Sequence, residues 1–227
     1  MRLTIIIPAY NEASTIGDVV RKLQTLQLPG IDRDVLVIDD GSTDRTAMIA
    51  KAHGAVVLRH LINRGLGGAL GTGLQAALRR EADVIVTFDA DGQHSPDDIE
   101  RLLQPILNGR ADVVIGCRLH HAGDMPVTRR IANRLANLVT RILYGVTTAD
   151  SQSGLRAFSR KAAGQITITS NNYDVSSEIC GEIGRHRLKL IEVPIRPIYT
   201  PYSLSKGQGV RVGLTTLLRL FLPRRTR

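Results

Sequence analysis

Short apolar runs alternate with longer amphipathic segments in the first half of the chain. The runs that predict strands are residues 3–8, 35–38, 55–58, 84–88 and 113–116. The segments between them carry apolar residues at helical spacing, for example Ile16, Val19, Val20 and Leu23. Runs that are apolar throughout are typical of parallel strands covered on both faces. We therefore predict an α/β fold with a doubly wound, mostly parallel central sheet and helices on both faces.

The second half of the chain has a less regular pattern. It predicts helices over residues 128–144 and 173–185 and a strand over residues 188–193. There is no internal repeat and no long linker. We expect one domain over residues 1–208, followed by a tail over residues 209–227.

Polar clusters follow four of the predicted strands. They are Ala9-Tyr10-Asn11-Glu12, Asp39-Asp40-Gly41-Ser42, Asp89-Ala90-Asp91-Gly92-Gln93-His94 and Cys117-Arg118. Ligands of open α/β sheets bind beyond the carboxyl ends of the strands. These clusters therefore predict a binding site at one edge of the sheet.

The DADGQH segment is the strongest candidate for a metal site. In extended backbone Asp89 and Asp91 point to the same side while Ala90 turns away. Paired carboxylates repel unless a cation or a proton separates them, and hard oxygen ligands favour Mg²⁺ or Mn²⁺. Gln93 could add a carbonyl oxygen. Alternatively the acids only cap a turn, with Ser95 and Asp98 forming a helix capping box; this accounts for residues 95–98 but leaves two acids unexplained.

The other acidic and glycine-rich segments allow two interpretations each. Asp39 or Asp40 can accept hydrogen bonds from a ribose or a base, whereas Ser42 or Thr43 can simply cap the next helix. Tyr10 and Glu12 would line the same pocket, or Tyr10 is a core aromatic. The glycine-rich segment 63–71 follows the third strand, so a dinucleotide fingerprint is disfavoured; it either approaches a diphosphate or packs tightly on the sheet.

Several basic and polar residues of the second half are candidates for binding phosphate. Arg118 could neutralise a phosphate, and Arg129, Arg130 and Asn133 share one side of a predicted helix. Solvated surface arginines are the alternative. A further candidate is the segment Asp150-Ser151-Gln152-Ser153-Gly154-Leu155-Arg156. It combines an acid, two hydroxyl groups, a glycine and an arginine, which is more than a polar turn requires.

Composition limits the classes of protein. No run of eighteen apolar residues occurs and no signal-peptide pattern begins the chain, which predicts a cytosolic protein without a membrane span. Cys117 and Cys180 are too few and too distant to indicate a disulfide framework or a zinc site.

The charge is uneven along the chain. Residues 1–116 carry 12 basic and 15 acidic side chains, and residues 117–227 carry 18 basic and 6 acidic ones. The basic half predicts an anionic partner. Aromatic residues make up 4% of the chain and Trp is missing, so a phosphate-bearing substrate or an anionic membrane fits better than nucleic acid.

The tail has its own pattern. Val210, Leu214, Leu217, Leu218 and Phe221 recur at helical spacing, and Arg224, Arg225 and Arg227 follow. This predicts an amphipathic helix that is too short to span a bilayer. It either lies on an anionic membrane surface or packs on its own domain or on a partner subunit.

Six motifs in order and in register carry a family resemblance. They are IIIPAYNE, VLVIDDGSTDRT, NRGLGGALGTG, FDADGQH, IGCR and DSQSGLRAF. Over roughly residues 3–206 the chain resembles family 2 glycosyltransferases of the GT-A fold, especially polyprenyl-phosphate glycosyltransferases of the dolichyl-phosphate mannose synthase type.

The resemblance implies an inverting, metal-dependent transfer of a hexose from GDP-mannose or UDP-glucose to a polyprenyl phosphate. The metal ligands would be Asp89, Asp91 and Gln93, and the residues around the base and ribose would be Pro8, Tyr10, Glu12 and Asp39. Further implied substrate contacts are Asp40, Gly67 and Ala90. Arg118 would contact a phosphate. The residues that position the acceptor would be Arg129, Asn133, Ser153 and Arg156. The catalytic set is Asp91, Arg118 and Asp150, the last as a base or an orienting group.

The sequence also departs from the family pattern. Asn133 stands where the family often has serine, and Thr200-Pro201-Tyr202-Ser203-Leu204-Ser205-Lys206 lacks the usual arginine and glycine. A soluble saccharide acceptor, which would require a general base, and a non-catalytic nucleotide-sugar-binding module remain alternatives. We expect a cytoplasmic protein, peripheral at the cytoplasmic face of the membrane or held by a membrane-anchored partner.

Overall fold

The computed structural model describes residues 1–118, 127–171, 174–196 and 198, without the side chains of residues 127–130 and 132. The strands are β1 (Arg2–Ala9), β2 (Asp32–Asp39), β3 (Val56–Arg59), β4 (Val84–Thr87), β5 (Val113–Cys117), β6 (Arg156–Ser159) and β7 (Leu190–Pro194). The helices are α1 (Ile16–Thr25), α2 (Thr46–Ala52), α3 (Gly65–Arg79), α4 (Asp98–Leu107), α5 (Val127–Tyr144), α6 (Arg160–Gln165) and α7 (Val175–Arg185). The predicted tail over residues 209–227 and the 200–206 motif lie outside the described residues.

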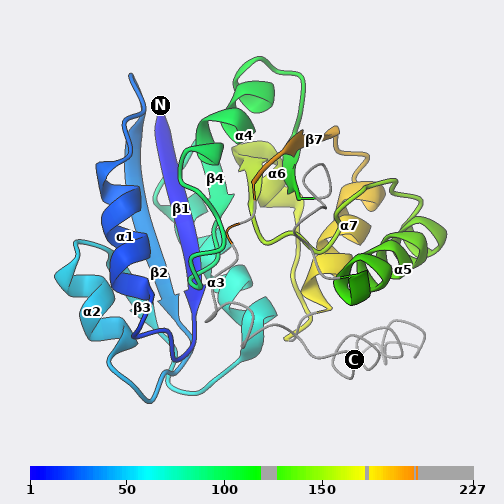
Figure 1. Cartoon of the computed structure of the whole chain (residues 1–227). Coiled ribbons are helices and arrows are strands. Elements are labelled where there is room, and N and C mark those ends of the chain that lie inside the picture. Colours follow the sequence, from blue (N-terminus) through cyan, green and yellow to red (C-terminus); the bar gives the residue numbers. More distant parts are fainter. Residues whose placement is uncertain (119–126, 172–173, 197, 199–227) are drawn as a thin grey trace.

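The strands form one seven-stranded sheet in the order β3-β2-β1-β4-β6-β5-β7 (Figure 1). Strands β1 to β4 pair in parallel, as do β5 and β7. Strand β6 runs antiparallel to both of its neighbours, β4 and β5. The predicted mostly parallel α/β sheet is therefore confirmed. Strand β6 was not predicted, because a four-residue segment that begins with arginine lacks a strand pattern.

Helices cover both faces of the sheet. Helices α1, α2 and α4 pack on one face, and α3, α6 and α7 pack on the other (Figure 1). In β1, Ile5 and Ile7 point into the first layer and Ile6 into the second, and all three are fully buried. Burying such a side chain contributes about 1.5–3 kcal/mol. Helix α5 packs against α7 at the edge of the second layer.

Two helix caps that the sequence offered as alternative interpretations are wrong. Helix α4 begins at Asp98 after Asp97, without a side-chain cap, and the Ser95 hydroxyl instead lies 3.3 Å from an Asp97 oxygen. Helix α2 begins at Thr46, whose amide donates to Asp44 Oδ1 at 2.9 Å. In both places the helix starts later than the sequence pattern suggests, so Ser95, Ser42 and Thr43 belong to the preceding loops.

Within the described part of the chain, no helix has the length and apolar character needed to cross a membrane.

Candidate active site

Asp89 and His94 form a close pair after β4. His94 Nε2 donates to Asp89 Oδ2 at 2.9 Å, and the His94 ring is 4% exposed and packs edge-on against Phe88. Burial would raise the pKa of Asp89, but the hydrogen bond and charge of His94, with the charges of Arg118 and Arg156, hold this pKa below its usual value. Asp89 therefore remains a carboxylate. Sequence reasoning gave His94 no role, and the structure shows that it holds Asp89.

Asp91 is held by its own loop. The backbone amide of Gln93 donates to Asp91 Oδ1 at 3.0 Å, and Gln93 Nε2 donates to Oδ2 at 2.5 Å. Burial and the charge of Asp89 raise the pKa of Asp91. Gln93 thus presents its amide nitrogen to Asp91, and its predicted role as a metal ligand requires the amide to turn. The Ala90 side chain is buried in the core at 5% exposure.

The carboxylate pair suits a hard divalent cation. Asp89 raises the pKa of Asp91, so the two side chains repel each other in the absence of a positive charge. Across the described residues, no group of three or more His, Cys, Asp or Glu side chains forms a metal centre. Mg²⁺ is commonly held by one or two carboxylates, with waters and substrate phosphates completing its shell. The two acids fit that kind of site.

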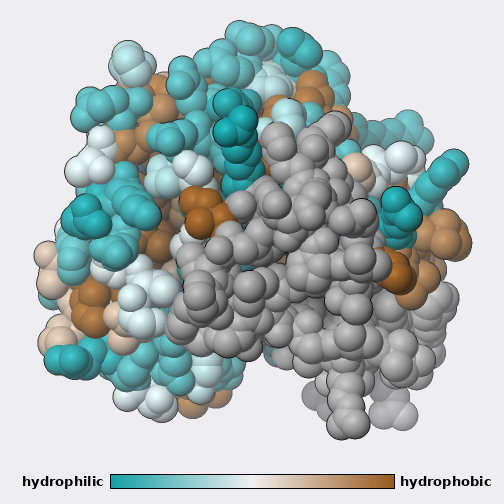
Figure 2. Space-filling view, viewed as in Figure 1, coloured by the Kyte–Doolittle hydropathy of each residue, from teal (hydrophilic) through white to brown (hydrophobic). Residues whose placement is uncertain are grey.

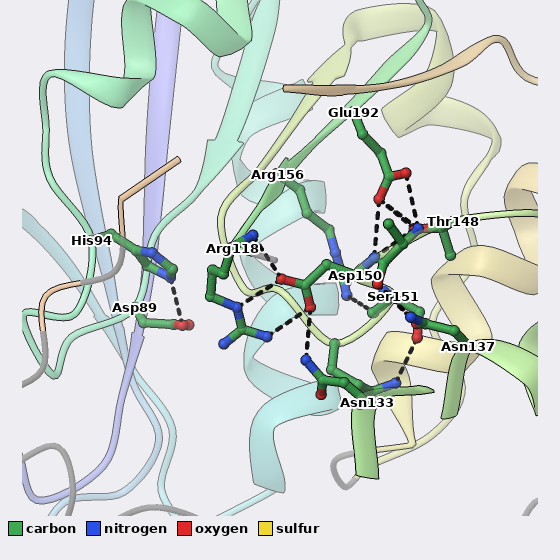
Figure 3. A network of polar contacts seen from close by, with 12 residues as sticks. Asp89, His94, Arg118, Asn133, Asn137, Thr148, Asp150, Ser151, Arg156 and Glu192 are labelled. Atoms are coloured by element: carbon green, nitrogen blue, oxygen red, sulfur yellow. Dashed lines mark hydrogen bonds and ion pairs between the residues drawn. The ribbon is translucent and has the colours of Figure 1, made fainter. Parts of the chain in front are cut away.

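Arg118 and Asp150 form a bidentate ion pair facing Asp89 (Figure 3). Arg118 Nε donates to Asp150 Oδ2 at 2.8 Å, and its Nη2 donates to Oδ1 at 2.8 Å. The Arg118 backbone amide also donates to Oδ2 at 3.0 Å, and Asn133 Nδ2 donates to Oδ1 at 3.3 Å. Asp150 is fully buried. Its carboxylate therefore orients Arg118 and, through Asn133, helix α5. A pair of this geometry is stronger than a single charged hydrogen bond.

The loop that carries Asp150 is fixed from two sides. Glu192 of β7 accepts from the Thr148 hydroxyl at 2.7 Å and from the Asp150 amide at 3.0 Å (Figure 3). Asn137 of α5 accepts from the Ser151 amide at 3.0 Å and donates to the Ala149 carbonyl. Sequence reasoning missed Glu192 and Asn137, since neither belongs to a recognisable motif.

Arg156 lies beneath this loop. The side chain is 2% exposed, and Nη2 donates to the Ser151 carbonyl at 2.8 Å. Burial lowers the pKa of Arg156, while the negative charges of Asp89 and Asp150 act in the opposite direction. Ser153 is fully buried, and its hydroxyl has no hydrogen-bond partner among the described residues. Two of the four residues predicted to position the acceptor, Ser153 and Arg156, thus lie below the surface of the site.

The loops after β1 and β2 form a joined wall. Asn11 Oδ1 accepts from the Thr43 amide at 2.9 Å, and the Asn11 amide donates to Ser42 Oγ at 3.0 Å. The Glu12 amide donates to Thr46 Oγ1 at 2.8 Å, and its carboxylate accepts from Thr15. Cross-links of this kind hold the two loops as one unit.

The predicted nucleotide-binding residues occupy different environments in this wall. Tyr10 is 45% exposed, which excludes the core interpretation, and Pro8 is half-buried beside Ile38. Asp39 is fully buried and forms an ion pair with Arg59 Nε at 3.0 Å, a partner that no motif indicated.

Asp40 and Gly67 both make close contacts with other residues of the protein. Asp40 accepts from the Arg64 and Gly65 amides at 2.9 and 2.7 Å, capping the region where α3 begins, and pairs with His60 at 2.6 Å. A Cβ on Gly67 would lie 1.8 Å from the Ser170 carbonyl oxygen. The second interpretation of the glycine-rich segment, tight packing, describes Gly67. The backbone of Arg129 lies in α5, and its side chain is outside the described residues.

Comparisons with known proteins identify the family of the chain. The family described as Glycosyl transferase family 2 matches residues 4–167. The chain belongs to glycosyltransferase family 2. An uncharacterized protein of Methanocaldococcus jannaschii is 45% identical over 223 residues, which cover 96% of this chain and 90% of that protein. The predicted family and enzyme class are therefore confirmed, and the chain is a glycosyltransferase.

Two relatives carry more informative names. UDP-N-acetylglucosamine--dolichyl-phosphate N-acetylglucosaminyltransferase of Methanococcus voltae is 37% identical, with 96% of this chain and 94% of that protein covered. Undecaprenyl-phosphate mannosyltransferase of Micrococcus luteus is 34% identical, with 94% and 90% covered.

Solved structures confirm the GT-A fold. Glucosyl-3-phosphoglycerate synthase from Mycobacterium tuberculosis, in complex with phosphoglyceric acid, matches with a TM-score of 0.74 and 25% identity, covering 99% of this chain and 81% of that one. The family 2 glycosyltransferase described here has its predicted site residues at one edge of the sheet, after β1, β2, β4 and β5.

Proposed function

We propose that this glycosyltransferase moves a sugar from a nucleoside-diphosphate sugar to the phosphate of a polyprenyl phosphate, with inversion at the anomeric carbon. The names of two relatives that cover nearly the whole chain support this acceptor class. The acceptor phosphate oxygen attacks the anomeric carbon, the bond from that carbon to the diphosphate breaks, and the nucleoside diphosphate leaves with the electron pair.

The observation that carries this proposal is that the Asp150 carboxylate already accepts hydrogen bonds from Arg118 and Asn133. A saccharide hydroxyl must lose a proton as it reacts, which requires a general base. Asp150 is fully buried and accepts hydrogen bonds from Arg118 and Asn133, so its carboxylate is already used to orient these two side chains. A phosphate acceptor is already anionic near neutral pH. It requires a nearby cation, and Arg118 provides one.

We further propose that Asp89 and Asp91 hold Mg²⁺ or Mn²⁺ against the donor diphosphate. Such an ion supplies Lewis-acid stabilisation of the charge that develops on the leaving phosphate. The protein contributes the orientation: His94 fixes Asp89, and the Gln93 amides fix Asp91. Tyr10, Glu12 and Asp39 are the proposed contacts to the base and ribose.

Three nucleotide sugars are candidates for the donor. GDP-mannose and UDP-glucose follow from the family resemblance, and the 37% identical relative adds UDP-N-acetylglucosamine. We propose that the protein works at the cytoplasmic face of a membrane, where its acceptor is anchored.

A radiolabelled donor panel tests the function. The full chain, Mg²⁺ or Mn²⁺ and a short-chain polyprenyl phosphate should yield a labelled lipid that partitions into organic solvent with at least one of the three donors. Asp91→Asn should reduce the yield by about 100-fold or more, because transition-state charge is no longer balanced. Labelled product on a soluble saccharide, with none on the lipid phosphate, would overturn the proposal. Equal turnover by Asp91→Asn would remove the metal role.

A further inference from the structure

Helix α5 exposes a continuous apolar stripe. Ile131, Leu135, Leu138 and Ile142 are 61%, 44%, 52% and 71% exposed. Their spacing of four, three and four residues places them on one narrow face of an α-helix. In Figure 2 hydrophobic residues gather at the right-hand margin, over α5. A contiguous exposed apolar patch of this kind marks an interaction surface.

The other side of the same helix builds the active site. Asn133 donates to Asp150, and Asn137 accepts from the Ser151 amide. The stripe and the Arg118–Asp150 pair are therefore connected by a single helix, whose diameter with side chains is about 10–12 Å. Whatever contacts the stripe lies within reach of the acceptor side of the site.

The charge around the stripe favours an anionic partner. Exposed Arg134 and Arg141 occupy the helical positions between the stripe and the asparagine side, and α5 contains no Asp or Glu. The part of the chain that contains α5, residues 117–227, carries 18 basic and 6 acidic residues. A helix that combines an apolar stripe with flanking arginines fits the headgroup region of an anionic bilayer.

We propose that the α5 stripe inserts into the interfacial region of an anionic lipid bilayer, with α5 lying in the membrane plane. The stripe spans residues 131–142, about 18 Å of helix, which is too short to cross a hydrocarbon core of about 30 Å. This orientation presents the Arg118–Asp150 side of the site to the surface where lipid phosphates lie. The identity of the acceptor rests on the proposed function, whereas the lipid contact itself does not.

Vesicle flotation of the full chain tests this contact. The wild type should float with vesicles of phosphatidylglycerol and phosphatidylcholine and bind vesicles of phosphatidylcholine alone at least about tenfold more weakly, because the flanking charges are then unpaired. Leu138→Asp combined with Ile142→Asp should weaken binding to the anionic vesicles by about tenfold or more. Leu61→Asp combined with Ile62→Asp is the matched control, since these side chains are 100% and 72% exposed in the loop after β3. This control should float like the wild type.

Four outcomes would overturn the inference. They are a wild type that does not float, a stripe variant that floats like the wild type, equal loss of binding in the control, and a stripe variant that changes only the oligomeric state in gel filtration. In the last case the stripe contacts a second copy of the chain. If deletion of residues 209–227 abolishes flotation while the stripe variant retains it, the lipid contact belongs to the tail.

The activity assay separates this inference from the proposed function. The stripe variant should keep wild-type turnover with a short, water-soluble polyprenyl phosphate and lose turnover only with a long-chain acceptor embedded in vesicles. Loss of turnover with both acceptors would show that the stripe supports the fold of the site, which overturns a purely interfacial role. A wild type that floats but makes no lipid-linked sugar would refute the proposed function and leave the lipid contact standing.

Discussion

Gly154 lies directly against the carboxylate of Asp89. A Cβ at position 154 would lie 2.3 and 2.4 Å from the two Asp89 oxygens and 2.6 Å from Cγ. These contacts are shorter than any that two such atoms tolerate. The loop before β6 and the loop after β4 therefore fit together only because residue 154 has no side chain.

Gly154→Ala should displace Asp89 and reduce kcat/KM by about 100-fold, since a shift near 1 Å at a catalytic group has effects of this size. Steady-state kinetics at saturating Mg²⁺ would measure it. Gly164→Ala is the matched control, because nothing lies within 4 Å of a Cβ at position 164 of α6. The control should retain full activity; wild-type kinetics in Gly154→Ala would show that Asp89 needs no fixed position.

Arg118→Lys should cost about tenfold or more in kcat, because an ammonium group cannot make the two parallel hydrogen bonds that the guanidinium makes to Asp150. Arg101→Lys alters the pair between exposed Arg101 and buried Asp98, in which the closest atoms are 3.4 Å apart, and should leave kcat unchanged. Kinetics of the two variants side by side would decide whether the bidentate geometry matters. An unchanged kcat in Arg118→Lys would show that charge alone suffices.

Glu192→Gln should loosen the loop that carries Asp150. The carboxylate accepts from the Thr148 hydroxyl and from the amides of Ala149 and Asp150, and an amide group cannot accept with both of its terminal atoms. The expected loss is about 1–3 kcal/mol in the free energy of unfolding, measured by urea denaturation.

Hydrogen exchange of backbone amides is a second measurement of the effect of Glu192→Gln on this loop. Protection of the backbone amides of residues 149–151 should fall in Glu192→Gln, with kcat falling and KM for the donor unchanged. Unaltered protection of these amides would remove the positioning role of Glu192.

Glu178 predicts a pH dependence of stability. Burial would raise the pKa of Glu178, but hydrogen bonds from the hydroxyls and amides of Ser170 and Thr169 lower it below the model-compound value of 4.5. The folded pKa is depressed, so this contribution to stability is fully present above about pH 4.5 and is lost as the pH falls through the folded pKa.

Urea denaturation of wild type and Glu178→Gln between pH 7 and pH 3 measures this contribution. The difference in unfolding free energy between the two proteins should be constant above about pH 5 and shrink below about pH 4.5. Glu100→Gln, an exposed position of α4, controls for general acid destabilisation. A Glu178→Gln difference that does not shrink in acid would contradict the assigned hydrogen bonds.

The sequence predicted the parallel core of the fold well. The apolar runs matched β1 to β5 to within a few residues, because strands buried on both faces have a strong and local signature. The helix predicted over residues 128–144 begins one residue early, at Val127. Strand β6 was missed, since its pairing with β4 and β5 is a long-range property that RAFS does not encode locally.

The candidate site was predictable only in its outline. The acids after β2 and β4 were found because they interrupt apolar strands. Their partners were not: His94 looked unremarkable until the loop brought its ring to Asp89, and Glu192 is 42 residues from Asp150 in the chain. Asp40 shows a further limit of the sequence, because an acid after a strand can serve the next helix as well as a ligand.

The reversed direction of β6 determines which part of the chain reaches the candidate site. An antiparallel strand begins at the edge where its parallel neighbours end, so the residues just before β6 arrive beside the loops that follow β4 and β5. A strand of the usual direction would have delivered Asp150 and Gly154 to the opposite end of the sheet. One inverted strand of four residues thus brings the loop before β6 to the edge of the sheet where the candidate site lies.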